Sequence, residues 1–444
     1  MSDTASAAVT ANILASQSND PSFENLYQEL VWRGLIHVST DAESLEKAIA
    51  DGGLTLYCGF DPTAPSLHLG HLVALLTVRR LQLGGHYPLA LVGGSTGLIG
   101  DPRMTSERVL NSKETVASWV GDLQEQIRPI LDFNGDHAAR MVNNLDWTAP
   151  LSAIDFLREI GKHFRVGTMI KKEIVASRLN SEEGISYAEF SYQILQGLDY
   201  LELYRQYGCT LQLGGSDQWG NLTSGTELIR KVEGKAVHAL GTPLITDSSG
   251  KKLGKSEGNA IWLNPTMTSP FEFYQYWLNV ADADVIDRLK VFTFFTRDEI
   301  ADFDEAVAQR PHAREAQRAL AFAVTSLVHG DAAALGVIEA SKALYGNGDL
   351  TALDEPTLVA ATAQLENVSA PASGLGVVEL FVASGLSKSN SEARRTIGEG
   401  GAYVNNVKVT DPDAVIDTTE LLHGKYALLR RGKRNLAAVT VADD

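Results

Sequence analysis

A strand–helix–strand pattern over residues 54–94 constrains the fold more than any other feature of this chain. Residues 54–59 (LTLYCG) have the apolar character of a short buried strand. Apolar residues then recur at helical spacing over 69–83, up to Gly84, and residues 89–92 (LALV) predict the next strand. Two strands joined by a helix form a βαβ unit. The pattern therefore predicts an α/β fold with a parallel sheet.

The rest of the chain divides into several parts. Residues 211–213 and 243–246 are predicted to be later strands of the same sheet. Helical patterns fill residues 111–130, 150–207 and the stretch from about 271. A run rich in Ala, Ser, Pro and Gly near 369–376 indicates a linker. A chain of 444 residues is expected to hold two or three domains.

Composition and charge exclude several classes of protein. Two cysteines rule out a disulfide scaffold and fit a reducing cytosol, so a cytoplasmic location is expected. Residues 1–20 have no Lys or Arg, and no apolar run is long enough to span a membrane. The net charge is −17, yet residues 371–444 carry nine basic and nine acidic side chains. The acidic excess therefore lies before residue 371, and a local basic surface for nucleic acid is not excluded.

The sequence His68-Leu69-Gly70-His71 stands where the first predicted helix begins. A helix N-terminus offers unpaired N–H groups and a positive dipole end, which suit a phosphate. Gly70 would let a nucleotide approach the backbone, and two imidazoles can donate hydrogen bonds to phosphate oxygens. The alternative is a pair of ordinary histidines at a helix start. The position directly after a strand and loop favours the phosphate site.

A glycine- and lysine-rich loop covers residues 250–256 (GKKLGKS). Lysine is a point charge on a long stem, so lysines in a flexible loop can follow a moving pyrophosphate. The alternative is a solvated turn. The combination of this loop with a histidine motif about 180 residues earlier favours a polyphosphate clamp.

Tyr192, Gln196 and Asp199 are spaced so that a helix would place them on one face. They lie among large apolar residues such as Phe190 and Leu201, and buried polar groups require partners. This pattern predicts a binding surface for a polar substrate. The alternative is a solvent-exposed side of the helix.

Together these motifs resemble the two signatures of the class I aminoacyl-tRNA synthetases, which flank ATP in a Rossmann-type domain. More narrowly, bacterial tyrosyl-tRNA synthetases are similar to residues 57–64 (YCGFDPTA), 97–102 (GLIGDP), 214–221 (GGSDQWGN) and 252–256 (KLGKS). The resemblance implies an enzyme, a tyrosine–tRNA ligase. Such an enzyme activates L-tyrosine with ATP to tyrosyl-adenylate and pyrophosphate, and then transfers tyrosine to the 3′ end of tRNA(Tyr).

The resemblance also implies a domain order, which begins with a Rossmann-type parallel-sheet catalytic domain. An α-helical anticodon-binding domain and a small α+β RNA-binding domain would follow. The expected boundaries are a flexible tail over 1–22, a catalytic domain with a helical insertion over 23–270, the anticodon-binding domain over 271–350, a linker over 351–376 and the ribosomal-protein-like RNA-binding domain over 377–444. A homodimer is expected, because the family dimerises through its central helical region.

Six side chains would bind the tyrosine substrate by this resemblance. Tyr57 and Asp199 would form hydrogen bonds with the phenol. The α-ammonium and carboxylate would be held by Asp101, Tyr192, Gln196 and Gln218. Phenylalanine would leave the phenol partners unpaired, so the pocket would select against it.

ATP would be bound by residues from both signatures. Thr63 and His68 would hold the γ-phosphate, and His71 would support the nucleotide and the helix start. The remaining contacts would come from Gly59, Asp61, Gly70, Gly215, Asp217, Leu244 and Ile245, with Lys252, Lys255 and Ser256 closing over the pyrophosphate. Mg²⁺ would accompany ATP, with no tightly bound cofactor and no metal site on the protein. Since the tyrosine carboxylate is already ionised, the chemistry requires positioning and charge stabilisation and no protein nucleophile.

One loop departs from the family pattern. Relatives often have one or two lysines between their Gly-Asp-Pro turn and a Ser-Glu-Arg stretch, whereas residues 103–108 (RMTSER) are one residue shorter there and have none. Arg103 offers a substitute charge. Pyrophosphate contacts from this loop are therefore left unassigned.

The C-terminal segment resembles a small RNA-binding domain first known in a ribosomal protein. The matching residues are the SxSEARR stretch from Ser389 and the GGxxVN stretch that follows it. Contacts to tRNA phosphates would come from Arg394, Arg395, Arg430, Arg431 and Lys433, with Arg230 and Lys231 facing the acceptor stem. The alternative for both groups is solvated surface charge.

Two other functions remain open. A tryptophanyl-tRNA synthetase shares the same chemistry, but Tyr57 with Asp199 suits a phenol better than an indole. A non-catalytic RNA-binding paralogue would be expected to lose His68, Lys252 or Lys255, and all three are present.

Overall fold

The structure is a computed structural model that describes residues 14, 16–103, 109–246, 260–344, 348–363, 365–371, 376–432 and 435–442. The predicted site residues Lys252, Lys255, Ser256 and Lys433 lie outside this range. The chain forms two compact units: an N-terminal unit of Met1–Thr268 with Trp277–Val328, and a C-terminal unit of Ser269–Tyr276 with His329–Asp444. No helix in the described part of the chain is long and apolar enough to cross a membrane.

The N-terminal unit is built on a six-stranded sheet with the strand order β1-β6-β5-β2-β3-β4. Neighbouring strands are parallel, except that β1 runs antiparallel to β6. The strands are β1 (Val38–Ser39), β2 (Thr55–Phe60), β3 (Tyr87–Val92), β4 (Arg140–Asn143), β5 (Cys209–Gly215) and β6 (His238–Thr242). The predicted Rossmann-type parallel sheet is confirmed.

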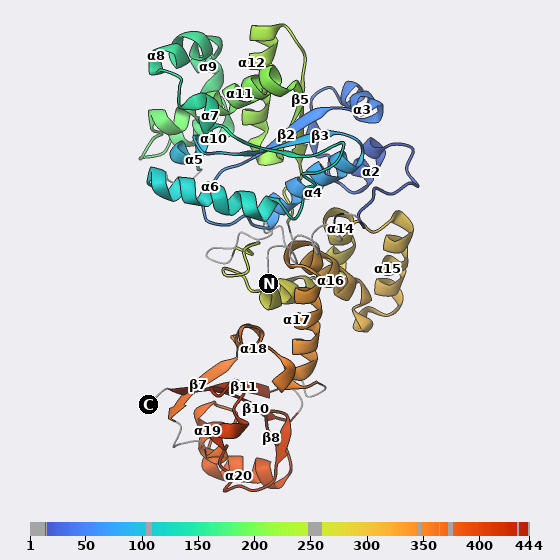
Figure 1. Ribbon diagram of the computed structural model, residues 1–444, viewed down its shortest axis with the longest axis vertical. Helices are drawn as coiled ribbons and strands as arrows, with labels where there is room; N and C mark the ends of the chain where they lie inside the picture. Colours follow the sequence, from blue (N-terminus) through green and yellow to red (C-terminus); the bar gives the residue numbers. More distant parts are fainter. Residues whose placement is uncertain are drawn as a thin grey trace. The chain divides into compact units, whose positions relative to one another are not determined.

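Helices cover both faces of this sheet, as Figure 1 shows. The main helices are α4 (Leu69–Leu83) and α6 (Lys113–Ile127) on one face, and α11 (Tyr187–Tyr207) and α12 (Trp219–Glu233) on the other. Successive strand residues point to opposite faces of the sheet. Tyr57 of β2 points to the face covered by α11, where it packs with Leu198 and Tyr200 in one core cluster. Burial on both faces explains why the central strands are almost continuously apolar.

Shorter helices complete the N-terminal unit. They are α2 (Leu26–Trp32), α3 (Ala42–Asp51), α5 (Thr96–Ile99), α7 (Leu145–Thr148), α8 (Ala153–Asp155), η1 (Phe156–Ile160), η2 (Gly161–His163), α9 (Val166–Met169), α10 (Glu173–Leu179), η3 (Ser216–Gln218), α14 (Asp282–Phe292), α15 (Arg297–Gln309), η4 (Pro311–Ala313) and α16 (Glu315–His329). Residues 16–22, expected to belong to a flexible tail, include Asn19 and Asp20. Asn19 donates to the Arg80 carbonyl at 2.9 Å, and Asp20 accepts from the Arg297 amide at 2.6 Å.

Most predicted elements of the sheet region are confirmed within a residue or two. The helix after the histidine motif begins at Leu69 and ends at Leu83, with Gly84 as its C-cap. The strand predicted over 243–246 was wrong, because β6 is His238–Thr242 and ends before that segment. Pro243 has no N–H to continue the ladder, which fits an end of the strand at this point.

The C-terminal unit contains a five-stranded sheet with the order β7-β11-β10-β8-β9. Strands β7 and β11 are parallel and the other pairs are antiparallel. The elements from residue 270 and from residue 331 onward are α13 (Pro270–Leu278), α17 (Asp331–Leu344), η5 (Leu350–Ala352), α18 (Glu355–Thr362), β7 (Glu366–Pro371), α19 (Val377–Ala383), α20 (Asn390–Gly398), β8 (Ala402–Val404), β9 (Val407–Val409), η6 (Thr418–Glu420), β10 (Tyr426–Arg431) and β11 (Asn435–Ala442). This is the small α+β architecture that the sequence predicted for the end of the chain.

The segment expected to be a linker, residues 351–376, contains ordered elements. Helix α18 lies in it, and β7 pairs with β11 from Glu366 to Pro371. Strand β7 is an edge strand in which Ala370 is the buried residue, so its sequence lacks the apolar alternation that predicts a strand. The helices from α14 to α16 belong to the N-terminal unit, whereas α17 belongs to the C-terminal unit.

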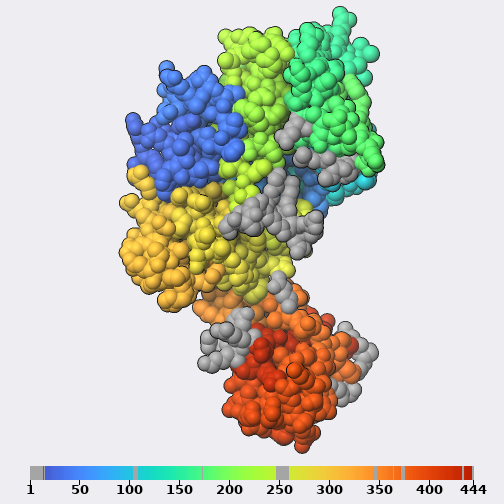
Figure 2. All heavy atoms as spheres, turned by 180° about the vertical axis from the view of Figure 1, so that it is seen from behind, coloured from blue at the N-terminus to red at the C-terminus, as the bar shows by residue number. Residues whose placement is uncertain are grey.

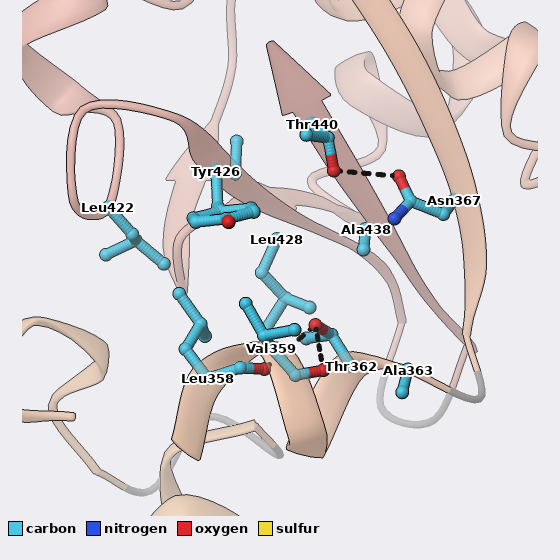
Figure 3. A pocket seen from close by; sticks show the side chains of 11 residues that line it. Leu358, Val359, Thr362, Ala363, Asn367, Leu422, Tyr426, Leu428, Ala438 and Thr440 are labelled. Atoms are coloured by element: carbon cyan, nitrogen blue, oxygen red, sulfur yellow. Dashed lines mark hydrogen bonds between the residues drawn. The ribbon is translucent and has the colours of Figure 1, made fainter. Parts of the chain in front are cut away.

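A small cavity of about 90 Å³ lies between α18 and the sheet of the C-terminal unit (Figure 3). Its lining is mainly apolar and includes Leu358, Val359 and Leu428. At its wall, the Thr440 hydroxyl donates a 3.1 Å hydrogen bond to Asn367. None of the predicted site residues lines it.

Candidate active site

The two motif histidines form the N-terminal cap of helix α4. His68 is the N-cap, and its Nδ1 accepts from the Gly70 amide at 3.0 Å. The Nδ1 of His71 accepts from the His68 amide at 3.1 Å, and the rings stack with centroids 3.9 Å apart. A neutral ring whose Nδ1 accepts carries its proton on Nε2. Both rings are therefore set as Nε2–H donors at a helix N-terminus, which suits phosphate oxygens.

Gly70 is required by the cap itself. A Cβ at this position would lie 2.9 Å from the Cε1 atom of His68, closer than real Cβ contacts allow. The sequence predicts that the space at Gly70 accommodates a nucleotide. In the structure, the His68 ring occupies that space.

Asp61, at the end of β2, joins the loop to two other elements. Its carboxylate accepts from the Thr96 hydroxyl and from the Tyr192 hydroxyl, each at 2.6 Å. Gly93 permits this approach, because a Cβ there would stand 2.1 Å from Asp61 Oδ1. Tyr192, predicted for tyrosine binding, is thereby fixed beside a residue predicted for ATP binding.

Asp199 lies in a buried polar pocket at the sheet. Its two oxygens accept from Asn144 Nδ2 at 3.0 Å and Trp147 Nε1 at 2.9 Å. Burial raises the pKa of Asp199 to about 7, although these two hydrogen bonds favour the ionised form. The carboxylate is 3% exposed, so it is shielded from water.

Tyr57 of β2 is the second predicted phenol partner. Its hydroxyl is buried and has no hydrogen-bond partner among the described residues. Burial and the neighbouring Asp199 carboxylate raise the pKa of Tyr57 well above its usual value. A buried hydroxyl without a partner is costly, so this position is suited to a ligand that supplies one.

Three carboxylates surround the Tyr192 side chain. Burial raises the pKa of Tyr192, and the charges of Asp61, Asp101 and Asp199 raise it further. Such a concentration of negative charge favours a bound cation. Gln196 lies half-buried one turn along the same helix, α11, which confirms the predicted shared helix.

Asp101 is held by the residues that follow β5. It accepts from Gln218 Nε2 at 2.8 Å and Asn221 Nδ2 at 3.0 Å. Lys172 lies close by and donates to the Gly220 carbonyl and the Ser224 hydroxyl. Burial lowers the pKa of Lys172 to about 8, against the opposing effect of Asp101.

The other predicted ATP residues lie at the carboxyl ends of β2, β5 and β6. Gly59 and Thr63 are exposed where β2 passes into its loop, and Gly215 with Asp217 occupies the turn after β5. Leu244 and Ile245 follow β6. Because β2, β5 and β6 are adjacent and parallel, these residues share one edge of the sheet, where α/β proteins bind ligands.

The flanks of the predicted lysine loop are attached to the same unit. Before the loop, the Thr246 carbonyl accepts from the Arg288 guanidinium. After it, the Leu69 amide donates to the Ile261 carbonyl at 3.2 Å, and His68 forms an isolated antiparallel bridge with Trp262. The chain that leaves the lysine loop therefore pairs with the histidine segment.

The predicted RNA contacts differ in their surroundings. On α12, Arg230 is exposed and paired with Glu227, while Lys231 donates to the His163 carbonyl. In the C-terminal unit, Arg394 and Arg395 are exposed on α20, in ion pairs with Asp413 and Glu399.

Two arginines of β10 have mainly internal contacts. Arg431 donates to the Leu386 carbonyl and to Glu392. Arg430 is 8% exposed, and its guanidinium lies 3.9 Å from the centroid of the Tyr403 ring. The structure therefore does not place Arg430 at the surface.

Five residues of the site were missed by the sequence argument: Thr96, Asn144, Trp147, Lys172 and Asn221. Asn144 and Trp147 are more than fifty residues from Asp199 in sequence, so no spacing rule links them. Asn221 belongs to the GGSDQWGN stretch of residues 214–221, and its side-chain amide three residues after Gln218 is the sequence signal that could have identified it.

Comparison with known families agrees with this geometry. The family model described as "tRNA synthetases class I (W and Y)" matches residues 50–346. The model described as "Tyrosine--tRNA ligase SYY-like C-terminal domain" matches residues 358–439. The second match begins inside α18 and includes β7, as the structure would lead one to expect.

Individual relatives are similar over nearly the whole chain. A tyrosine–tRNA ligase of Leifsonia xyli subsp. xyli is 64% identical, over 97% of both chains. One of Streptomyces avermitilis is 61% identical, over 94% of this chain and 99% of its own. A C-terminally truncated mitochondrial tyrosyl-tRNA synthetase of Aspergillus nidulans has a TM-score of 0.64 at 29% identity, over 71% of this chain and 93% of its own. The chain belongs to the tyrosine–tRNA ligase family of class I aminoacyl-tRNA synthetases.

Proposed function

We propose that this chain, as a tyrosine–tRNA ligase, catalyses two consecutive steps. The carboxylate of L-tyrosine attacks the α-phosphorus of ATP, a new C–O–P link forms, and pyrophosphate leaves. The tyrosyl group of the adenylate then passes to a hydroxyl at the 3′ end of tRNA(Tyr), and AMP leaves. The observation that carries this proposal is the buried Tyr57 hydroxyl near the Asp199 carboxylate, for which the described part of the chain provides no hydrogen-bond partner.

Tyr57 and Asp199 recognise the phenol in this proposal. The phenol O–H donates to Asp199, and the phenol oxygen accepts from Tyr57. The indole N–H of tryptophan has no oxygen to accept from Tyr57, which disfavours the tryptophanyl alternative. The similarity to tyrosine–tRNA ligases, at 64% and 61% identity over nearly the full length, also supports tyrosine as the substrate.

The other end of tyrosine lies among the three carboxylates near Tyr192. Asp101, Tyr192 and Gln196 bind the α-ammonium, and Gln218 positions the carboxylate. The negative surroundings of Tyr192 support a cation at this place. Asn144 and Trp147 position Asp199, because each donates one hydrogen bond to its carboxylate.

ATP extends from the tyrosine carboxylate toward the start of helix α4. His68 and His71 donate from Nε2 to phosphate oxygens, and Thr63 assists them. Gly59, Asp61, Gly215, Asp217, Leu244 and Ile245 line the nucleotide, and Gly70 completes the cap. Lys252, Lys255 and Ser256 close over the pyrophosphate. Donors fixed before the reaction stabilise the developing charge without reorganising.

ATP would be accompanied by Mg²⁺ in this proposal, and the ion would supply neutralisation of part of the phosphate charge. Within the described ranges, no group of three His, Cys, Asp or Glu side chains is placed to hold a metal ion. The residues at the phosphate end are N–H and O–H donors, which fit phosphate oxygens better than they fit a cation.

tRNA(Tyr) binds through basic residues of both units. Arg230 and Lys231 face the acceptor stem, and Arg394, Arg395, Arg431 and Lys433 contact backbone phosphates. Arg430 supports this surface from beneath, because its guanidinium is stacked on Tyr403. The helices of residues 271–350 read the anticodon in this proposal.

The protein acts as a cytoplasmic homodimer in this proposal. Several large apolar residues of the helices between α7 and α11 are exposed, including Ile154, Val166 and Tyr187. Their segments gather on one part of the surface, teal to green in Figure 2. Exposed apolar groups of this kind mark protein–protein interfaces.

The test is exchange of labelled pyrophosphate into ATP by the purified protein. We expect exchange with L-tyrosine and none above background with L-tryptophan or L-phenylalanine. Exchange that is absent, or that does not depend on tyrosine, would overturn the proposed function.

A further inference from the structure

Gln126 of helix α6 is bonded to the loop that precedes the motif histidines. Its Oε1 accepts from the Leu67 amide at 2.9 Å and lies 3.0 Å from the Ser66 hydroxyl. Its Nε2 donates to the Pro65 carbonyl at 3.1 Å and to the Asp122 carbonyl of its own helix at the same distance. One side-chain amide thus contacts three consecutive residues, the last of which directly precedes His68.

The same loop holds the chain that follows the predicted lysine loop. The Leu263 amide donates to the Leu67 carbonyl at 2.9 Å, and the Asn264 amide donates to the Ser66 hydroxyl at 3.0 Å. Ser66 is 3% exposed and Leu67 is fully buried. Both residues are therefore packed between α6 and the segment at 263–264.

We propose that Gln126 is a positioning residue for the phosphate end of the active site. Its hydrogen bonds fix the position of the 65–67 loop relative to α6. The loop in turn fixes the positions of His68 and of the segment at 261–264 that pairs with it. Gln126 does not touch the reacting groups in this proposal. The inference rests on the proposed adenylation reaction, whose transition state needs the histidine donors at fixed positions.

Loss of the Gln126 amide removes the acceptor of a buried N–H, so the loop is expected to shift until Leu67 finds another partner. Displacement of a catalytic group by about 1 Å can lower the rate on the order of 10²-fold. The tyrosine pocket depends on other contacts, from Asn144 and Trp147 to Asp199. Gln126 should therefore affect the ATP-dependent step and leave tyrosine binding intact.

The decisive variant is Gln126→Leu in the full chain. A leucine is accommodated, because Gln126 borders a groove of about 270 Å³. We expect kcat for tyrosine-dependent pyrophosphate exchange to fall between about tenfold and 10²-fold, with an unchanged Kd for tyrosine in the absence of ATP. Gln126→Glu keeps the acceptor but loses the bond to Pro65, so it should recover part of kcat.

The matched control is Gln124→Leu. Gln124 is two residues away on the same helix, about 200° around its axis, so the substitution should leave kcat as in the unmodified protein. Ser66→Ala should lower kcat as well, and its effect should not add to that of Gln126→Leu, because both act through one contact.

Each outcome has a defined meaning. Full exchange activity in Gln126→Leu would overturn the positioning role. A drop in kcat accompanied by an equal loss of tyrosine affinity would also overturn it, since this marks general damage to the fold. If the unmodified protein itself shows no tyrosine-dependent exchange, the proposed function fails first.

Discussion

At the residue scale, the proposed recognition of tyrosine depends on one buried carboxylate. Asp199 receives two hydrogen bonds, yet burial still raises its pKa to about 7. A phenol O–H donates better to a carboxylate than to a neutral acid. Affinity for tyrosine should therefore follow the ionisation of Asp199.

We predict that tyrosine binds more weakly as the pH falls below about 7, where Asp199 takes up a proton. The sign follows from linkage: the free protein must release this proton before it binds, so Kd should rise about tenfold per pH unit below the pKa. Equilibrium dialysis with labelled tyrosine, from about pH 5.5 to about pH 8, measures this change in Kd. Asp199→Asn should bind weakly at every pH. A pH-independent Kd in the unmodified protein would contradict the role of Asp199.

A second prediction concerns Tyr57→Phe. Its hydroxyl has no partner among the described residues, so removal should not lower the melting temperature. The substrate phenol would lose one hydrogen bond, worth about 1 kcal/mol, and kcat/KM for tyrosine should fall between about fivefold and tenfold. Pyrophosphate exchange and thermal unfolding measure the two effects. A large loss of stability without a change in kcat/KM would show that the hydroxyl serves the fold.

The residues of this pocket that share one helix were predictable from the sequence. Tyr192, Gln196 and Asp199 lie on α11, as their spacing predicts. Asn144 and Trp147 could not be found, because they reach Asp199 from a different segment after β4. Only tertiary structure brings such pairs together.

At the scale of elements, the start of helix α4 combines a structural and a chemical task. The Nδ1 atoms of His68 and His71 cap the helix, which leaves their Nε2 atoms as proton donors. The two tasks therefore use different atoms of the same rings. Substitutions can separate them.

We predict that His68→Asn keeps the stability of the protein and loses activity. Asparagine is a favourable N-cap, whereas alanine loses about 1 kcal/mol at this position. Neither side chain supplies the Nε2–H donor, so kcat for pyrophosphate exchange should fall about 10²-fold in both variants. Thermal unfolding should then distinguish the two, with a lower melting temperature only for His68→Ala. Full activity in His68→Asn would show that the cap is the histidine's only task.

Strands and helices with a clear apolar period were predictable, and the others were not. β2 was predicted within a residue, because it is buried on both faces and bounded by a glycine and a proline loop. β6 (sequence HALGT) was predicted at the wrong residues. It is largely buried, but His238, Gly241 and Thr242 break the apolar pattern that would predict a buried strand. β7 was predicted as linker, because an edge strand with one buried residue has no apolar pattern.

At the scale of the whole molecule, the chain clusters into two compact units. The helices from 277 to 328 cluster with the sheet that carries the site, whereas α17 clusters with the C-terminal unit. Contact between α13 and α17 includes the 3.2 Å bond from Gln275 to Ser341. A truncation that preserves this contact should therefore end after Leu344, the last residue of α17.

We predict that the protein truncated after Leu344 still forms tyrosyl-adenylate, because every proposed tyrosine and ATP contact precedes this point. Aminoacylation of tRNA(Tyr) should fall by about tenfold or more, since the basic residues from Arg394 onward are removed. Pyrophosphate exchange and tRNA charging, measured on one preparation, separate the two activities. Undiminished charging would show that the C-terminal unit does not bind tRNA.

The most direct test of the central claim is a crystal structure with a non-hydrolysable analogue of tyrosyl-adenylate. We expect the phenol oxygen to lie within hydrogen-bonding distance of both the Tyr57 hydroxyl and the Asp199 carboxylate. We also expect the adenylate to lie toward the end of the site formed by His68 and His71. A phenol bound elsewhere, with the Tyr57 hydroxyl still lacking a partner, would contradict it.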